Sequence, residues 1–556
     1  MVRSPADEVL SDSERGERVE ELYRRATMKK SEWKDLQIDC VRAQGEVERY
    51  NLFFDSIKNK DGTIFYIGQL LQRSALLYPD NTALMYLGEK ISYKQLYQRS
   101  VLLSKKLIER GIKPKDRVLI LFQNSLDFYV AYFAVLQAGA IVAPLNIFLK
   151  ERELSHIVQD ANASLIIASS EKVELFTNNN LPDIMTEQDF PLPTHNAESV
   201  LNFDIPCLQD DELAVLLYTS GTTGLPKGVM LSSKNIMTNV VQLMARIPLC
   251  RAQRLFCVLP LFHSFAQNTC IWSAFYAGCT VIVVPKIQRK GILEGLKEKP
   301  TVFLGVPALY GLLCLLKTAP LDTVDFFVSG GDALPDKIRA GFELIYRRKL
   351  CNGYGLTETA PLISVDLEDV AQPTNNIGRP VLGIDCSIRD EHKKELPQGE
   401  IGELWVKGDN IMMGYYNAPE KTAEVLQDGW FCTGDLAMFD RNGKLLICGR
   451  EKDLIIHKGL NIYPQEIENI LVGHMAVLYA GVIGKQDEQH GEIPIAFVQL
   501  HPGKKTDGMA QALRQLCIKN LAAYKIPRSF IFVHDMPLTA TNKVDKKRLR
   551  KQIESV

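Results

Sequence analysis

Short apolar runs alternate with longer stretches of helical periodicity from about Thr63 to the later part of the chain. Because the runs contain no regular polar position, they predict strands buried on both faces of mostly parallel sheets. They are RVLILF (117–122), SLIIAS (164–169), LAVLLYT (213–219), LFCVLP (255–260), CTVIVVP (279–285) and FFVSGG (326–331). Helices are predicted between them, for example over 93–111 and 232–247. This alternation predicts an α/β fold.

The longest uncharged stretch, residues 128–149, is long enough to cross a bilayer. It is interrupted by Gly139 and Pro144 and contains the polar residues Gln137 and Asn146. The stretch therefore predicts a buried helix, a glycine stop and a strand rather than a membrane span.

The alternation of apolar runs and helical stretches ends near residue 385, which indicates a boundary between domains. Segments 386–408 and 428–450 predict hairpins with QG, DG and NG turns, and so a β-rich subdomain over about 380–450. We expect a large domain over 61–450, a hinge near 450–453, and a small mobile C-terminal α+β domain over 453–556. Residues 1–60 form a charged extension with an exposed helix predicted over 17–37 and no apolar core typical of a secretory signal.

Composition narrows the class of protein. Hydrophobic residues make up 46% and charged residues 24%, which excludes wholesale disorder, collagen and coiled-coil rods. Lys and Arg total 65 against 66 Asp and Glu, so no nucleic-acid partner is expected. The 12 cysteines form no CxxC pair and predict free thiols in a reducing compartment. We expect a cytoplasmic protein and leave open both a peripheral membrane contact and the oligomeric state.

The segment YTSGTTGLPKGVM (218–230) carries the strongest chemical signal. It follows an apolar strand and precedes a helix capped by Ser232 or Ser233, and its glycines allow backbone amides to approach an anion. Because the Lys is not followed by the Ser or Thr of a Walker A loop, the P-loop reading fails. We expect a clasp for the phosphates of ATP, formed by Thr219, Ser220, Gly221, Thr222, Thr223 and Lys227.

This segment resembles the phosphate-binding signature of the AMP-forming acyl-CoA synthetases. That superfamily also holds aryl-CoA ligases, peptide-synthetase adenylation domains and firefly luciferase. Four more motifs are similar to the family's signatures, in the same order, and the resemblance covers about residues 63–550. They are YGLTET (354–359), TGD (433–435), GREKDLIIHKGLNIYPQEIE (449–468) and PLTATNKVDKKRL (537–549).

The resemblance implies roles for residues around ATP. Glu358 would hold Mg²⁺, and Thr357 would donate to the α-phosphate. Asp435 would accept from the ribose hydroxyls, and Arg450 would donate to the same sugar. The adenine would lie between Tyr354, which Gly355 follows, and the turn formed by Gly330, Gly331 and Asp332.

The resemblance also assigns roles in the C-terminal domain. Lys543 would bridge the incoming carboxylate and the α-phosphate. Lys452 would be the hinge about which the small domain swings between two half-reactions. The swing would replace Lys543 at the site with Lys458, Gly459 and Leu460, which line the path of the acceptor thiol.

The segment 259–278 aligns with the part of the family that lines the acid tunnel. His263 would pack beside the acyl carbonyl, and a His at this position argues against an amino acid substrate. The other tunnel candidates carry no charge, which favours a long aliphatic or hydrophobic aryl tail. They are Phe262, Phe265, Gln267, Thr269, Val306 and Leu362.

Together these features predict an ATP-dependent fatty acid ligase that forms acyl-AMP and pyrophosphate and transfers the acyl group to CoA. Three alternatives within the family stay open: transfer to the phosphopantetheine thiol of acyl carrier protein, an aryl-acid CoA ligase, and a luciferase-like oxygenase. A scaffold that only binds nucleotide is disfavoured because Lys227, Glu358, Asp435, Arg450 and Lys543 are all present.

Overall fold

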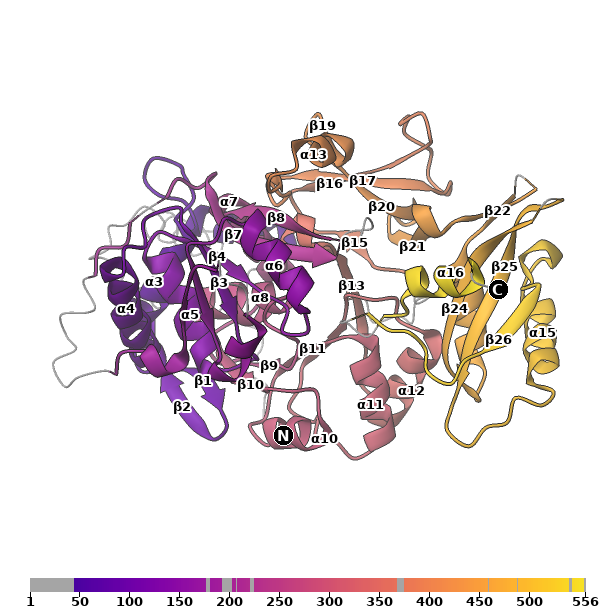
Figure 1. The fold of residues 1–556 in the computed structure, drawn as a ribbon, viewed down its shortest axis with the longest axis horizontal. Helices are drawn as coiled ribbons and strands as arrows, with labels where there is room; N and C mark the ends of the chain where they lie inside the picture. The colour runs from indigo at the N-terminus through magenta and orange to yellow at the C-terminus, as the bar shows by residue number, and fades with distance from the viewer. Residues whose placement is uncertain are drawn as a thin grey trace, which may run out of the picture.

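The computed structural model describes residues 45–176, 181–192, 203–206, 208–220, 225–367, 375–458, 460–487, 489–539 and 543–554. Two large sheets with helices form the N-terminal body, a third sheet adjoins it, and a smaller α+β domain ends the chain (Figure 1). This arrangement confirms the predicted α/β fold class.

The larger body sheet has nine strands in the order β15-β14-β13-β12-β11-β9-β10-β1-β2. The strands from β13 to β1 pair in parallel, and antiparallel strands lie at both edges. The strands are β1 (Thr82–Tyr86), β2 (Glu89–Ser92), β9 (Arg254–Cys257), β10 (Thr280–Val283), β11 (Val302–Gly305), β12 (Phe326–Ser329), β13 (Cys351–Gly355), β14 (Leu362–Asp366) and β15 (Arg379–Pro380).

The second body sheet has seven strands in the order β18-β8-β7-β4-β3-β5-β6. The strands from β7 to β6 are parallel, whereas β8 and β18 join antiparallel. The strands are β3 (Arg117–Leu121), β4 (Ile141–Pro144), β5 (Leu165–Ala168), β6 (Asp183–Met185), β7 (Leu213–Ser220), β8 (Pro226–Ser232) and β18 (Gly414–Tyr415).

Helices fill the space between these sheets and cover their outer faces. One core cluster joins strands of both sheets through α3, α4, α5 and α7; separate clusters lie under α10–α12 and under α6. The α-helices of the body are α2 (Glu46–Ser56), α3 (Leu70–Leu77), α4 (Tyr93–Glu109), α5 (Leu126–Gln137), α6 (Glu151–Asp160), α7 (Ser233–Arg246), α8 (Ser264–Gln267), α9 (Ala274–Tyr276), α10 (Arg289–Leu296), α11 (Pro307–Leu316), α12 (Asp336–Tyr346) and α13 (Pro419–Val425). Shorter helical segments are η2 (Ile67–Gln69), η3 (Ser170–Leu175), η4 (Glu187–Asp189), the π-helical η6 (Asn268–Ser273), η7 (Thr357–Thr359), η8 (Glu451–Asp453) and η9 (Ala523–Lys525).

The uncharged stretch 128–149 contains most of α5, a left-handed Gly139 and then β4, as its pattern predicts. Both elements are buried within the body. Within the described ranges, no helix combines the length and hydrophobicity needed to cross a bilayer.

Helix α2 lies against α7 although it falls within the predicted charged extension. Glu46 forms an ion pair with Arg246 at 3.1 Å, the Arg49 Nε donates to the Ala245 carbonyl at 2.8 Å, and Phe53 is buried in the body core. The packing of the body therefore includes residues from Glu46 onward. The helix predicted over 17–37 lies outside the described residues.

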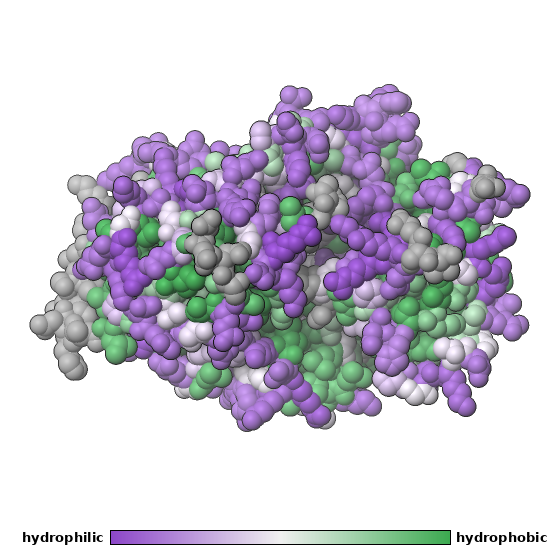
Figure 2. Space-filling model, viewed as in Figure 1, coloured by the Kyte–Doolittle hydropathy of each residue, from purple (hydrophilic) through white to green (hydrophobic). Residues whose placement is uncertain are grey.

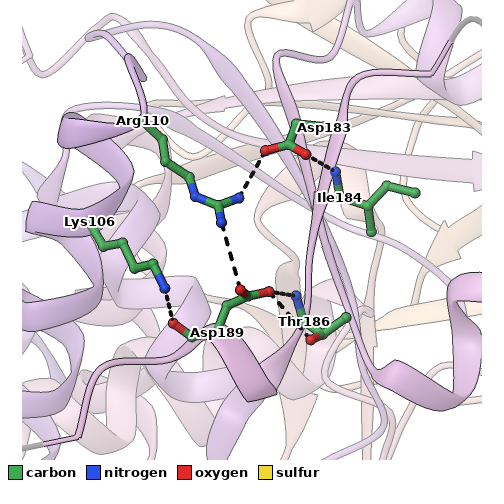
Figure 3. A network of polar contacts seen from close by, with 6 residues as sticks. All are labelled: Lys106, Arg110, Asp183, Ile184, Thr186 and Asp189. Carbon is green, nitrogen blue, oxygen red and sulfur yellow. Dashed lines mark hydrogen bonds and ion pairs between the residues drawn. The ribbon is translucent and has the colours of Figure 1, made fainter.

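A polar network fastens the edge strand β6 to α4 (Figure 3). The Arg110 guanidinium pairs with Asp183 at 2.9 Å and with Asp189 at 3.7 Å, and Lys106 donates to the Asp189 carbonyl at 2.5 Å. Asp189 also accepts from the backbone amide of Thr186 at 3.0 Å. These contacts join the last strand of the sheet to a helix of the central layer.

The β-rich sheet follows the order β16-β17-β20-β19, with β21 paired to β20, and the predicted hairpins form it. Its strands are β16 (Ile384–Arg389), β17 (Gly402–Gly408), β19 (Leu426–Gln427), β20 (Trp430–Phe439) and β21 (Leu445–Arg450). The C-terminal domain contains β22 (Ile455–His457), β23 (Leu460–Ile462), β24 (Val477–Asp487), β25 (Gly491–Leu500), β26 (Ser529–Phe532), α14 (Pro464–Gly473), α15 (Met509–Asn520) and α16 (Lys546–Glu554).

The C-terminal domain meets the body beside α12. The Lys337 ammonium donates to the His474 carbonyl at 3.4 Å, and α12 contacts α14. The ten cysteines that the structure describes are free thiols, whereas Cys40 and Cys207 lie outside the described residues.

Candidate active site

Three neighbouring parallel strands place candidate residues at one edge of the nine-stranded sheet. Val306 follows β11, Gly330 and Gly331 follow β12, and Tyr354 and Gly355 end β13. Ligands of α/β sheets bind at the carboxyl ends of the strands. A Cβ at Gly355 would collide with the Pro361 carbonyl, so the chain turns there only with glycine.

Asp435 is the centre of a compact hydrogen-bonded group. The Tyr354 hydroxyl donates to Asp435 Oδ2 at 2.5 Å, and the Arg450 Nε pairs with Oδ1 at 2.7 Å. Asp435 and Arg450 are cross-strand neighbours on β20 and β21, which explains their contact. Burial raises the pKa of Asp435, while the charge of Arg450 and the Tyr354 hydrogen bond act in the opposite direction. The structure thus brings together three residues that the family resemblance assigns to the nucleoside.

A second group surrounds Glu358, which lies on η7. The Tyr415 hydroxyl donates to Glu358 Oε1 at 2.9 Å, and the Lys227 ammonium lies 4.8 Å from the centre of the Tyr415 ring. Mg²⁺ on a nucleotide usually needs only one or two protein carboxylates, because phosphates and water supply the other ligands. A single carboxylate with one oxygen held by a phenol and a lysine close by fits that role.

Thr357 precedes Glu358 on η7 and contacts the segment that carries His263. The Thr357 hydroxyl is 3.3 Å from that of Ser264, the residue after His263. Burial lowers the pKa of His263 to about 4, and the positive charge of Lys543 acts in the same direction. The buried His263 Nε2 has no hydrogen-bond partner within the part of the chain that the structure describes. His263 is therefore neutral at pH 7 and keeps one free ring nitrogen.

Lys543 reaches the site from the C-terminal domain. Burial lowers the pKa of His263 and the charge of Lys543 lowers it further, while the same charge opposes the rise that burial causes in the pKa of Asp435. The backbone amide of Lys543 donates to the Thr539 hydroxyl at 3.2 Å, and Thr539 returns a backbone bond to the Lys543 carbonyl at 2.7 Å. This pair of bonds joins Lys543 to Thr539.

The tunnel candidates do not all lie in the same surroundings. A Cβ at Gly330 would lie 3.3 Å from the Phe265 ring and one at Gly331 would lie 3.7 Å from Val306, so both side chains border the candidate adenine pocket. Gln267 instead enters the helical layer, where its Oε1 accepts from the Tyr132 hydroxyl at 3.1 Å.

The remaining candidates, Phe262, Thr269 and Leu362, are buried or partly buried. The Thr269 hydroxyl donates to the Phe265 carbonyl at 2.9 Å within the helix. The six candidates carry no charge between them, and His263, which lies in the same segment as four of them, is neutral.

The phosphate-clasp segment is described in part. Gly221, Thr222 and Thr223 lie outside the described residues, as does the Ser220 side chain, whereas Thr219 on β7 pairs in register with Lys227 on β8. The strand β8 was not predicted from the sequence, and it separates the clasp from α7. Ser232 does cap α7, with Asn235 completing a capping box.

The hinge candidate Lys452 lies near the nucleoside group, since it follows Arg450 by two residues and its charge acts on Asp435. Lys452 is on η8, where its carbonyl accepts from Arg550 at 3.3 Å, and Asp453 pairs with Arg550 at 2.6 Å. Lys458 occupies a left-handed turn between β22 and β23, and its amide donates to the His490 carbonyl. Leu460 is half exposed, and Gly459 lies outside the described residues.

Two residues of the site were missed in the sequence. Tyr415 contacts Glu358 across 57 positions, and Ser264 contacts Thr357 across 93. Ser264 directly follows His263, so its place beside a candidate residue could have indicated a role in the site. Tyr415 stands in a GYYNAPE segment with no chemical motif of its own.

The chain is similar to known enzyme families and to curated relatives over most of its length. The AMP-binding enzyme family profile matches residues 71–416, and the AMP-binding enzyme C-terminal domain profile matches residues 466–543. A long-chain-fatty-acid–CoA ligase of Bacillus subtilis (strain 168) is 32% identical over 523 residues, covering 86% of this chain and 93% of the relative. A feruloyl-CoA synthase of an Amycolatopsis species is 33% identical over 491 residues, covering 87% and 99%.

Among solved structures, the O-succinylbenzoate coenzyme A synthetase of Bacillus subtilis in complex with ATP and magnesium ion has a TM-score of 0.78 and 26% identity. The superposition covers 87% of this chain and 99% of that one. Both the body and the C-terminal domain thus have counterparts in proteins whose names specify acid–CoA ligation.

Proposed function

The chain belongs to the family of AMP-binding enzymes and is an adenylate-forming acid–CoA ligase, and we propose that its acid substrate is a long-chain fatty acid. The carrying observation is that none of the six tunnel candidates, all of which the structure describes, carries a charge. The six tunnel candidates are neutral side chains, and His263 is uncharged because its pKa is lowered to about 4. A site lined by these side chains offers no charged partner to the tail of the acid, so it suits an apolar chain.

In the first half-reaction, the fatty acid carboxylate attacks the α-phosphorus of ATP, and the bond to the pyrophosphate oxygen breaks. Lys543 stabilises the negative charge shared by the carboxylate and the α-phosphate, which is strongest in the transition state. Thr357 donates to the α-phosphate. Products are acyl-AMP and pyrophosphate.

The nucleoside is held by residues of the body. Asp435 accepts from the ribose hydroxyls, Arg450 orients Asp435, and Tyr354 presents its ring to the adenine, opposite Gly330, Gly331 and Asp332. Glu358 would hold Mg²⁺, which would offset phosphate charge. Lys227 and the clasp bind the outer phosphates.

In the second half-reaction, the thiol attacks the acyl carbonyl, loses its proton, and AMP leaves. The acceptor is CoA rather than the thiol of acyl carrier protein, because the relatives described above are named as CoA ligases. Rotation about Lys452 withdraws Lys543 and brings Lys458, Gly459 and Leu460 to the thiol path.

The acid can be identified by offering the purified enzyme a ladder of saturated acids from acetate upward, with ATP and CoA in excess. Each buried methylene is worth about 0.8 kcal/mol, so kcat/KM should rise severalfold per carbon and reach a plateau beyond about ten carbons. The matched competitor is ferulate, since a feruloyl-CoA synthase has similar identity to this chain. A maximum at acetate, or a preference for ferulate over every aliphatic acid, would refute the fatty acid assignment and leave the ligase assignment intact.

A further inference from the structure

The orientation of the C-terminal domain is not fixed by a shared apolar core. Among the described residues, no core cluster contains residues from both sides of Lys452. Figure 2 shows strongly hydrophilic residues on the visible face where the body and the C-terminal domain meet. A polar junction of this kind permits relative motion of two domains. The position of Lys543 beside the body therefore depends on the backbone around Lys452.

The backbone that follows Lys452 is held by the last helix of the described chain. Arg550 on α16 donates to the Lys452 carbonyl at 3.3 Å and pairs with Asp453 Oδ1 at 2.6 Å. The Lys546 ammonium, one turn earlier on the same helix, lies 3.9 Å from Asp453 Oδ2. The Asp453 side chain is only 14% exposed, so water competes little for its oxygens. We call Asp453, Lys546 and Arg550 the hinge clamp.

Helix α16 is in turn fixed to the rest of the C-terminal domain. Leu549 and Val544 pack on Gly481 of β24, where a Cβ would lie 2.8 Å from each of these side chains. Lys546 also pairs with Glu468 of α14 at 2.8 Å. The hinge clamp therefore joins the peptide between residues 452 and 453 to a helix that packs on both the sheet and α14.

The same helix is tied to the segment that carries Lys543. Helix α16 begins at Lys546, three residues after Lys543. Leu538 and Val544 form a β-bridge across the segment that contains Lys543. One connection thus runs from the hinge through Arg550 and α16 to the lysine that acts at the reacting atoms.

We propose that Arg550 is a positioning residue for Lys543. By holding the Lys452 carbonyl and the Asp453 carboxylate together, it confines rotation of the domain to the φ and ψ of Lys452. Without Arg550, rotation would spread to the residues that follow, and the Lys543 ammonium would be placed less accurately between the acid and the α-phosphate. A displacement of about 1 Å is enough to slow a reaction on the order of a hundredfold. This inference rests on the proposed roles of Lys452 and Lys543.

The first test compares the two half-reactions in Arg550→Ala. The kcat for acyl-AMP formation should fall about tenfold, because Lys543 is less accurately placed. The KM for ATP should stay within about twofold, since Asp435 and Tyr354 lie in the body and keep their contacts. Thioester formation from pre-made acyl-AMP does not use Lys543 and should also stay within about twofold. Equal losses in the two half-reactions, or no loss in either, would overturn the proposal.

The matched control is Arg548→Ala. Arg548 lies on the same helix, pairs with Asp545 at 3.3 Å and has a side chain that is 68% exposed. Its replacement should leave both rates unchanged, and a loss equal to that of Arg550→Ala would overturn the proposal. Arg550→Lys keeps a charge opposite Asp453 but lacks the planar fork that reaches two acceptors, so it should recover only part of the rate.

The second test repeats Arg550→Ala in a chain that carries Lys543→Ala. If Arg550 acts through Lys543, its loss should change the remaining rate of acyl-AMP formation by less than about twofold. A further fall of about tenfold in the double variant would mean that Arg550 acts in another way, and would overturn the proposal. A normal rate in Lys543→Ala alone would overturn the proposed role of Lys543 together with this inference. A normal rate in Arg550→Ala alone would overturn only the inference.

Discussion

Tyr354 and Asp435 are joined by a hydrogen bond of 2.5 Å between the phenol oxygen and Oδ2. The other carboxylate oxygen is held by Arg450, so both oxygens have fixed directions before a nucleotide arrives. A ribose therefore meets an acceptor that needs little reorganisation.

Replacement of Asp435 by Asn should raise the KM for ATP at least about tenfold, because hydrogen bonds to a charged acceptor are worth about 1.5–3 kcal/mol. Initial rates of pyrophosphate exchange at varied ATP would show it. Tyr354→Phe keeps the ring and removes one hydrogen bond, so its effect should be smaller. An Asp435→Asn enzyme with an unchanged KM for ATP would exclude a ribose contact.

Lys543→Ala should lower acyl-AMP formation by at least about a hundredfold, since the missing charge acts in the transition state. Thioester formation from pre-made acyl-AMP should be spared. Both rates can be measured by quenched-flow on the same preparation. Lys543→Arg keeps the charge but changes its shape, and should recover only part of the first rate. Equal losses in the two half-reactions would contradict the assignment.

Lys452→Pro should slow thioester output while pyrophosphate exchange continues. Proline fixes φ near −65°, which suits the short helix η8 but opposes a change of conformation there. Lys452→Ala is the matched control, because it removes the side chain and leaves the backbone free. Wild-type rates in both half-reactions of the proline variant would mean that Lys452 is not the hinge.

Acid should destabilise the protein through His263. Its folded pKa of about 4 lies below the ordinary value of 6.5, so the unfolded chain binds more protons between these values. The contribution to the free energy of unfolding is complete above about pH 6.5 and falls as the pH drops toward 4, by about 2 kcal/mol at pH 5. Urea unfolding of the wild type and His263→Gln at pH 7 and pH 5 should show a smaller acid loss in the variant. Equal losses would mean that His263 is protonated in the folded state.

Elements with a strong local pattern could be predicted from the sequence. The apolar runs at 117–122 and 279–285 became β3 and β10, and the segment 93–111 became α4 with a Ser92 cap. Burial on both faces leaves a continuous apolar run, so the short length and apolar composition of these runs predicted the strands.

Features that depend on distant partners could not be predicted in this way. The strand β8 begins with Pro226 and Lys227 and has little strand character, yet it pairs with the buried strand β7 and with the two-residue β18. Tyr415 likewise gained a role only because this pairing brings β18 beside Glu358. Local propensity is overridden when tertiary contacts supply the partners.

The edges of the two body sheets bear on solubility. The nine-stranded sheet ends in β15, which has only two residues and contains Pro380, and in β2, whose Glu89 and Lys90 are exposed. The seven-stranded sheet ends in β6 and β18, with three and two residues. Short, charged or proline-containing edges give a second chain few backbone groups to pair with. These wide parallel sheets are therefore protected against edge-to-edge aggregation in the folded protein.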